Sequence, residues 1–139
     1  MFEDCAFLNC RFERVRLAFA RLAGCKLVGS TFLRCDLRPL TVEGGDWSYV
    51  TLRGEDLRGV SFADVKLAEA DLSDADLAGC SLAGADLSHA RLRGVKLRGA
   101  DLRGAVLDGC DVDLVDWTDV RIDMALAVLL ARARGAIVE

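Results

Sequence analysis

The sequence has too little of several residue types to support the common kinds of functional site. It contains one histidine, His89, and no Cys-x-x-Cys pair, so a zinc site of the Cys/His type cannot be completed. Nucleophile-elbow and phosphate-loop motifs are absent as well. The longest apolar run, residues 124–131, is far shorter than the roughly 20 residues that a membrane-spanning helix needs. We therefore expect no catalysis, no metal, no cofactor and no membrane insertion, and we interpret His89 as a solvated turn residue.

The chain also lacks an excess of basic residues. Its formal net charge is −4, which gives no support to general binding of nucleic acid or of membrane surfaces. At 139 residues it is long enough for one domain with a sizeable core. Because the pattern described next already includes Phe2, we expect no leader peptide and a cytoplasmic protein.

A strict five-residue period organises the sequence. Every fifth residue from Phe2 to Ile122 is apolar, and the pattern is most regular over residues 82–107, where leucine recurs without exception. The residue two positions before each of these is nearly always small. Neither an α-helix, with a period of 3.6, nor a strand, with a period of 2.0, has this repeat. A fixed period of this kind indicates a solenoid, in which the chain winds into a coil.

The repeating Ala-Asp-Leu-x-Gly pattern, as at Ala100 to Gly104, resembles that of the pentapeptide repeat family. This resemblance implies an all-β fold, a right-handed quadrilateral parallel β-helix with four pentapeptides in each coil. It also implies that the apolar and small positions point inward, while the other three positions face solvent. We expect this β-helix to extend over residues 1–122.

The segment that follows Ile122 predicts a C-terminal helix. Asp123 can cap a helix over residues 124–134, and Gly135 suits the position just past its end. Residues 123–139 therefore form a second unit, which caps the last coil. The helix is apolar around more than one face, so part of it requires a partner, and a two-fold dimer is the commonest solution. The residues predicted to form this homodimer interface are Leu126, Val128, Leu129 and Leu130.

Six cysteines occupy the small inward position and are separated by multiples of five residues. Buried cysteine packs as a small hydrophobic residue, and free thiols are typical of a reducing compartment. We interpret them as core residues rather than as metal ligands or disulfides. They are Cys5, Cys10, Cys25, Cys35, Cys80 and Cys110.

Departures from the regular pattern are concentrated in residues 39–57. Pro39 precedes a bulky Leu40 at a small position, and Gly45 precedes an oversized Trp47 at the apolar position. Because protein interiors are close-packed, we interpret these exchanges as volume compensation in the core. Glu55 places a carboxylate at an inward position, where it needs hydrogen-bond partners. We favour a local bulge there over a functional site.

Three segments resemble a narrower group within the family, the mycobacterial fluoroquinolone-resistance proteins, and the last of the three also resembles the tail of the plasmid-borne quinolone-resistance proteins. They are Cys-Asp-Leu-Arg-Pro-Leu-Thr at residues 35–41, Asp-Leu-Arg-Gly at residues 56–59 and the tail over residues 121–135. This resemblance implies a homodimer joined through the C-terminal helix. It also implies a non-enzymatic protein that binds DNA gyrase or topoisomerase IV by imitating B-form DNA, and that protects the enzyme from quinolones or inhibits it.

The surface charge is unevenly distributed among the four expected faces. Acidic residues outnumber basic ones on two adjacent faces, and the two kinds nearly balance on the other two. Coils that stack about 4.8 Å apart would give a rod of roughly 30 Å, although its charge density would be far below that of duplex DNA. The predicted partner-binding residues are Asp64, Glu69, Asp86, Asp101 and Asp108.

Two other functions stay open at this level. One is a general scaffold for protein interactions, in which the acidic balance serves only solubility. The other is nucleic-acid contact through the first two coils, which are rich in arginine.

Overall fold

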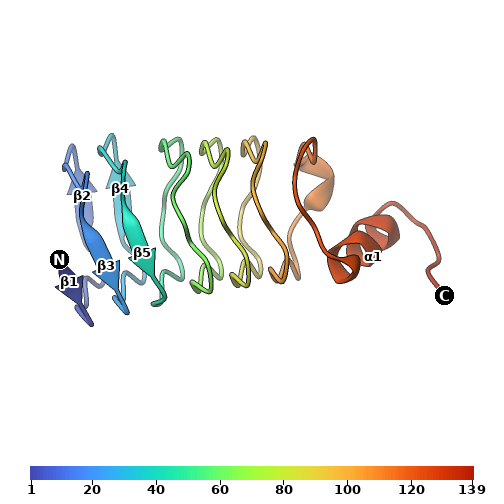
Figure 1. Cartoon of the computed structure of the whole chain (residues 1–139), viewed down its shortest axis with the longest axis horizontal. Coiled ribbons are helices and arrows are strands. Elements are labelled where there is room, and N and C mark those ends of the chain that lie inside the picture. Colours follow the sequence, from blue (N-terminus) through green and yellow to red (C-terminus); the bar gives the residue numbers. More distant parts are fainter.

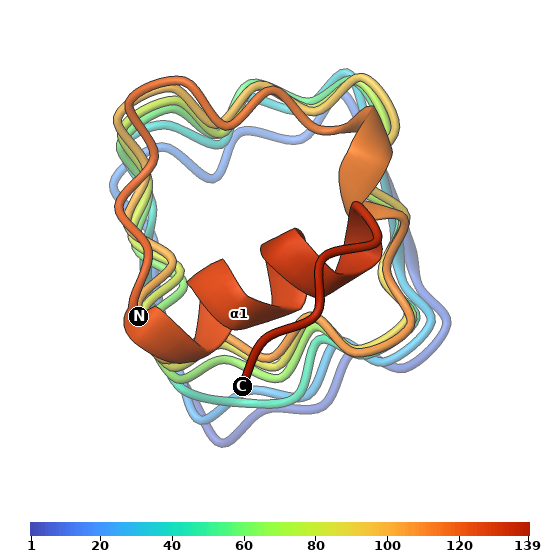
Figure 2. The same cartoon turned by 90° about the vertical axis from the view of Figure 1, so that its right-hand side faces the viewer.

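The computed structural model describes the whole chain, Met1–Glu139, as a stack of coils that advances along a single axis (Figure 1). Parallel pairing joins each residue to the one 20 positions later, as in Phe2 with Leu22 and Asp56 with Asp76. One coil therefore contains four pentapeptides, as the resemblance to the pentapeptide repeat family implies. The coils superpose into a four-sided outline when viewed along the axis (Figure 2). The right-handed sense of the winding stays a prediction.

The regular elements are short because the chain turns after every five residues. Strands β1, β3 and β5 form one parallel sheet, and β2 and β4 form another. From Thr51 onward the coils are joined by single parallel bridges. The elements are β1 (Phe2–Glu3), β2 (Arg11–Glu13), β3 (Arg21–Ala23), β4 (Thr31–Leu33), β5 (Thr41–Glu43), the 3-10 helix η1 (Val112–Leu114) and α1 (Met124–Ala133).

The core is a continuous column of the apolar and small positions. It extends from Leu22 to Val115 within the coils and is completed by Leu126 from α1. In the first coil Phe2 is exposed, and Phe7, Phe12 and Leu17 are only partly buried, because this coil has a neighbour on one side alone. The predicted inward positions are thus confirmed along the rod.

Each pentapeptide ends in a tight turn with a fixed backbone requirement. In the turn from Leu82 to Ala85, the Ala85 N–H donates to the Leu82 carbonyl at 3.0 Å, and Gly84 has a φ of 70°. A positive φ at the third residue is what a type II turn requires. The equivalent residue has a positive φ in every turn from Asp4 to Asp119, except at Pro39 and Leu114.

The regular coil changes at both exceptions. At Leu114 the turn is replaced by η1, so the expectation of regular coils up to Ile122 is wrong for residues 112–114. Proline cannot adopt a positive φ and has no N–H to donate. Pro39, which follows a cis peptide bond, therefore cannot form the standard turn, and the Leu40 N–H makes no bond to the Leu37 carbonyl.

One rung of the backbone hydrogen-bond ladder is missing beside Pro39. Asp36 is bridged to the coil before it and Asp56 to the coil after it, but no bridge joins Asp36 to Asp56. The N–H groups of Leu37 and Asp56, which would form this rung, donate no hydrogen bond within the chain. We call this opening the coil gap. Its cavity of about 560 Å³ is lined by residues 35–40 and by Asp56, Arg58, Gly59 and Val60.

Trp47 belongs to the core, as its predicted role in volume compensation requires. Its side chain is 1% exposed, lies parallel to the Phe32 ring at 5.9 Å and meets the Phe62 ring edge-on at 5.6 Å. Gly45 permits the close approach of its coil to the preceding one, because a Cβ atom at its position would overlap the backbone carbonyl of Cys25.

Substitution of alanine for Gly45 is therefore expected to lower the free energy of unfolding by at least ~2 kcal/mol, since the backbone of the preceding coil must shift. The neighbouring Gly44 also has a positive φ, but a Cβ atom there would meet no atom within 4 Å. Gly44→Ala should cost only the ~1–2 kcal/mol of the left-handed conformation. Urea unfolding of the two variants measures the difference, and equal losses would contradict this explanation.

The cysteines pack as the sequence predicts. All six are free, and Cys25 and Cys80 are buried. The Cys80 thiol donates to the Leu57 carbonyl of the preceding coil at 2.7 Å, and Cys110 donates to the Leu87 carbonyl at 2.9 Å. Burial raises the pKa of the Cys80 thiol to about 12 and that of Cys110 to about 11, so both stay protonated at neutral pH.

Helix α1 lies across the C-terminal end of the coils (Figure 2). The predicted N-cap is confirmed, because the Asp123 carboxylate accepts from the Leu126 N–H at 2.9 Å. Asp123 also accepts from the Gly104 N–H at 2.6 Å, which ties the helix to the last complete coil. The helix ends at Ala133, one residue before the predicted end. Neither α1 nor η1 has the length and apolar character needed to cross a membrane.

Candidate partner-binding surface

The five predicted acidic residues lie on two adjacent sides of the rod and on three consecutive coils. The 20-residue register places them there: Asp64 and Glu69 share one coil, Asp86 lies on the next, and Asp101 and Asp108 lie on the third. Asp64, Glu69 and Asp108 are exposed and form no ion pair. These three side chains, which we call the acidic surface, present free negative charge to a partner.

Asp101 and Asp86 are less available than the sequence suggests. Arg103 donates to Asp101 through two nitrogens at 2.7 and 2.9 Å, and this pairing lowers the pKa of the Asp101 carboxyl to about 2. The Ser88 hydroxyl and N–H donate to Asp86 and lower the pKa of its carboxyl. Both carboxylates are half-buried, and the charge of Asp101 is compensated by its partner.

A neighbouring column of residues has alternating charge. Parallel bridges place Lys26, Asp46, Lys66 and Asp86 in consecutive coils. Because adjacent coils lie about 4.8 Å apart, these opposite charges largely cancel along the rod. The negative potential of this side therefore comes from the acidic surface at its corners.

The Asp101–Arg103 pair has a sequence signal that charge counting by face overlooks. Asp-Leu-Arg occurs at residues 101–103 and 56–58, and both copies form the same two-nitrogen ion pair. In the third copy, at residues 36–38, Arg38 forms no ion pair with Asp36, because Pro39 alters the turn. Arg38 reaches across the coil gap instead and donates to Asp56 at 2.9 Å.

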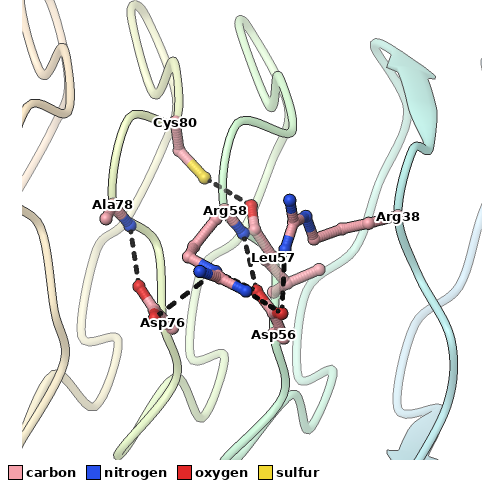
Figure 3. Close-up of polar contacts among 7 residues, drawn as sticks. All are labelled: Arg38, Asp56, Leu57, Arg58, Asp76, Ala78 and Cys80. Carbon is pink, nitrogen blue, oxygen red and sulfur yellow. Dashed lines mark hydrogen bonds and ion pairs between the residues drawn. The ribbon is translucent and has the colours of Figure 1, made fainter.

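Four charged residues form a network at the edge of the coil gap (Figure 3). Asp56 accepts from Arg38 and from two nitrogens of Arg58, which also lies 3.7 Å from Asp76. The bonds from Arg58 and then Arg38 hold the pKa of the Asp56 carboxyl far below its ordinary value. This network connects coils that lack a backbone rung between them.

The expectation of a bulge at Glu55 is wrong. Its N–H donates to the Leu52 carbonyl at 3.1 Å and its carbonyl accepts from Asp76 at 3.0 Å, so the backbone keeps the regular pattern. The inward carboxylate instead accepts from the backbone N–H groups of Arg34 and Cys35 in the preceding coil. In this position it bonds to backbone donors next to the missing rung.

Glu55 is expected to give the protein a pH-dependent stability. Burial raises the pKa of its carboxyl above the ordinary value of 4.5, and the two N–H donors only partly oppose this. A raised pKa in the folded state stabilises the fold below the ordinary value, and this stabilisation is lost as the pH rises through the raised pKa. Glu55→Gln, which does not titrate, should therefore gain stability relative to the wild type as the pH rises above about 4.5. A difference that stays constant with pH in urea unfolding would contradict this.

The residues predicted for the dimer interface are placed in different environments. Leu126 is 3% exposed and packs into the last coil, so it belongs to the cap within one chain. Leu129 and Leu130 are half-buried against the same core, and Val128 is half-buried outside it. Met124, which sequence reasoning did not include, is 80% exposed.

The 20-residue register, the repeated turns and the continuous inner column define a parallel β-helix built from pentapeptides. The family model of pentapeptide repeats matches four overlapping segments, residues 48–79, 56–94, 70–109 and 85–116. The chain belongs to the pentapeptide repeat family.

Individual relatives agree with this assignment. The chain is 44% identical to pentapeptide repeat protein MfpA of Mycobacterium tuberculosis over 52 residues, which are 37% of this chain and 28% of MfpA. It resembles the structure of HetL from the cyanobacterium Nostoc sp. strain PCC 7120, a protein involved in heterocyst differentiation regulation, with a TM-score of 0.51 and 28% identity over 86% of this chain and 60% of HetL. Full-length QnrB1, a plasmid-mediated fluoroquinolone resistance protein, shares the fold at a TM-score of 0.50 and 20% identity, over 96% of this chain and 89% of QnrB1. The chain thus spans less than two thirds of MfpA and of HetL.

Proposed function

We propose that this protein is a non-enzymatic, cytoplasmic homodimer that binds DNA gyrase or topoisomerase IV in the place of DNA. The observation that carries the proposal is the acidic surface of Asp64, Glu69 and Asp108 on a rod whose sequence is similar to MfpA. Binding there would inhibit the enzyme or protect it from quinolones, as the resemblance to the quinolone-resistance proteins implies.

The dimensions and charge of the rod support this proposal. Six coils about 4.8 Å apart give a length of roughly 30 Å, and a dimer joined at the C-terminal ends would be about twice as long. A DNA-binding channel is positively charged, so it attracts a rod-shaped protein that presents acidic groups along its length. Asp64 and Glu69 lie on one coil and Asp108 lies two coils further along, so exposed carboxylates recur along this part of the rod.

The competing function is a general protein-interaction scaffold. The alternating column of Lys26, Asp46, Lys66 and Asp86 favours it, because DNA does not carry compensating positive charge. The two functions differ in what they predict for a topoisomerase.

A gyrase supercoiling assay with added protein, repeated at several salt concentrations, distinguishes them. A DNA mimic should inhibit supercoiling, and inhibition should weaken as ionic screening increases. The protein alone should not shift the mobility of DNA, which separates mimicry from nucleic-acid binding by the basic first coils. Absence of inhibition at micromolar protein would favour the scaffold.

The dimer is proposed to form through the outer face of α1, with Val128, Leu129 and Leu130 at its centre and Met124 beside them. Val128→Glu places a charge on this face without touching the core, and it should convert dimers to monomers in sedimentation velocity. Leu126→Ala is the matched variant, since it should reduce stability by ~2–5 kcal/mol through the cap. A wild type that is monomeric at high micromolar concentration would contradict the proposed interface.

A further inference from the structure

The coil gap leaves four backbone groups without partners, two on each side. On one side these are the Cys35 carbonyl and the Leu37 N–H, and on the other they are the N–H and carbonyl of Asp56. The equivalent groups one coil later are paired, because Asp76 donates to Glu55 at 3.0 Å and accepts from Leu57 at 2.9 Å. The gap is therefore a local break on this side of the rod, where the ladder is continuous from Asp56 through Asp76 to Lys96 and is interrupted again between Lys96 and Asp116.

These four groups have the pattern of donors and acceptors that an additional parallel strand would satisfy. In a strand that lies between two parallel strands, the N–H and the carbonyl of one residue both form hydrogen bonds to the strand on one side. The residues before and after it form theirs to the strand on the opposite side. The central residue of an extended tripeptide can thus pair with Cys35 and Leu37. The carbonyl before it and the N–H after it then face Asp56.

The charge at the gap indicates what kind of segment fits. Asp36, Arg38, Asp56 and Arg58 line the cavity, and their four charges sum to zero. Arg38 and Arg58 are both bonded to Asp56, so neither is free to select an anion. A neutral group with alternating donors and acceptors is complementary to this lining, and an extended peptide backbone is such a group.

We propose that the coil gap is a binding site for a short extended segment of a partner protein, recognised through its main chain. The unpaired edge groups supply the hydrogen bonds, as in other cases in which a peptide adds a strand to a sheet. The cavity of about 560 Å³ leaves room for the segment, and a Cβ atom added at Gly59 would meet no atom within 4 Å. The site lies in the N-terminal half of the rod, away from α1, so it is distinct from the proposed dimer interface.

A phage-displayed library of random octapeptides, selected against the folded wild-type protein, tests this proposal. Selected peptides should bind at least tenfold more weakly to Gly59→Asn, which fills the gap with a residue that tolerates a positive φ. They should also bind more weakly to Pro39→Gly, which permits the standard turn and closure of the rung. Leu114→Gly is the matched control at the other altered turn, and it should bind like the wild type. Circular dichroism confirms that each variant is folded.

Two further measurements separate main-chain recognition from other modes. N-methylation of the peptide's central residue should abolish binding, because it removes the N–H that faces Cys35. Bound peptide should also slow alkylation of the Cys35 thiol by iodoacetamide, while the rate at Cys110 stays unchanged. Failure to select any peptide, equal binding to the gap variants, or full binding after N-methylation would each overturn the proposal.

Discussion

Replacing Asp64, Glu69 and Asp108 together by lysine is expected to weaken inhibition of gyrase by at least about tenfold. These three carboxylates are exposed and lack ion-pair partners, so they are the charges that an enzyme surface adapted to DNA would attract. Their reversal converts attraction into repulsion, and a loss of ~1.4 kcal/mol in binding free energy already corresponds to a factor of ten. The supercoiling assay measures the concentration needed for half-maximal inhibition.

A control variant with the same change in net charge separates the effect of where these residues lie from the effect of net charge. Asp36, Asp74 and Asp111 lie on the other two sides of the rod, are exposed and form no ion pair. Their replacement by lysine should reduce inhibition much less. Equal effects of the two triple variants would show that net charge, rather than the acidic surface, governs the interaction.

Leu87→Ala is expected to lower the free energy of unfolding by ~2–5 kcal/mol, a large part of the ~5–15 kcal/mol typical of a folded protein. Leu87 is fully buried, and Leu67 and Leu107 occupy the equivalent positions in the adjacent coils. Truncation would leave a cavity that the rigid stack cannot close, because each coil is held by hydrogen bonds to both neighbours.

Leu114→Ala is the matched control for this substitution. Leu114 lies in η1 and is more than half exposed, so its truncation should change stability by no more than about 0.5 kcal/mol. Urea unfolding monitored by circular dichroism measures both variants. A loss at Leu87 no greater than that at Leu114 would be incompatible with a core built on the five-residue period.

The five-residue period was enough to predict a solenoid, because leucine at every fifth residue can be buried on one side only if the chain turns at every pentapeptide. The resemblance to the pentapeptide repeat family implied the rest, namely four pentapeptides in each coil and the inward positions. The N-cap at Asp123 was equally predictable, because capping depends on local side-chain chemistry. Both features follow from residues close together in the sequence.

The features that were not predicted depend on contacts between coils or on a single turn. Pro39 was interpreted by volume, whereas its main effect is that it cannot adopt the positive φ of its turn. Glu55 was assigned to a bulge because its inward carboxylate had no evident partner in the sequence. Its backbone donors lie in the preceding coil, so they become visible only in the structure. Asp101 was predicted to bind a partner, whereas it forms an ion pair with Arg103, two residues later.

Competition between this protein and DNA for gyrase tests the central proposal most directly. A labelled linear duplex bound to gyrase is titrated with the protein while fluorescence anisotropy is recorded. If the acidic surface takes the place of DNA, the duplex should be released, and release should require more protein as salt increases. If the duplex stays bound while the protein also binds the enzyme, the protein occupies another surface and the proposal of DNA mimicry is wrong.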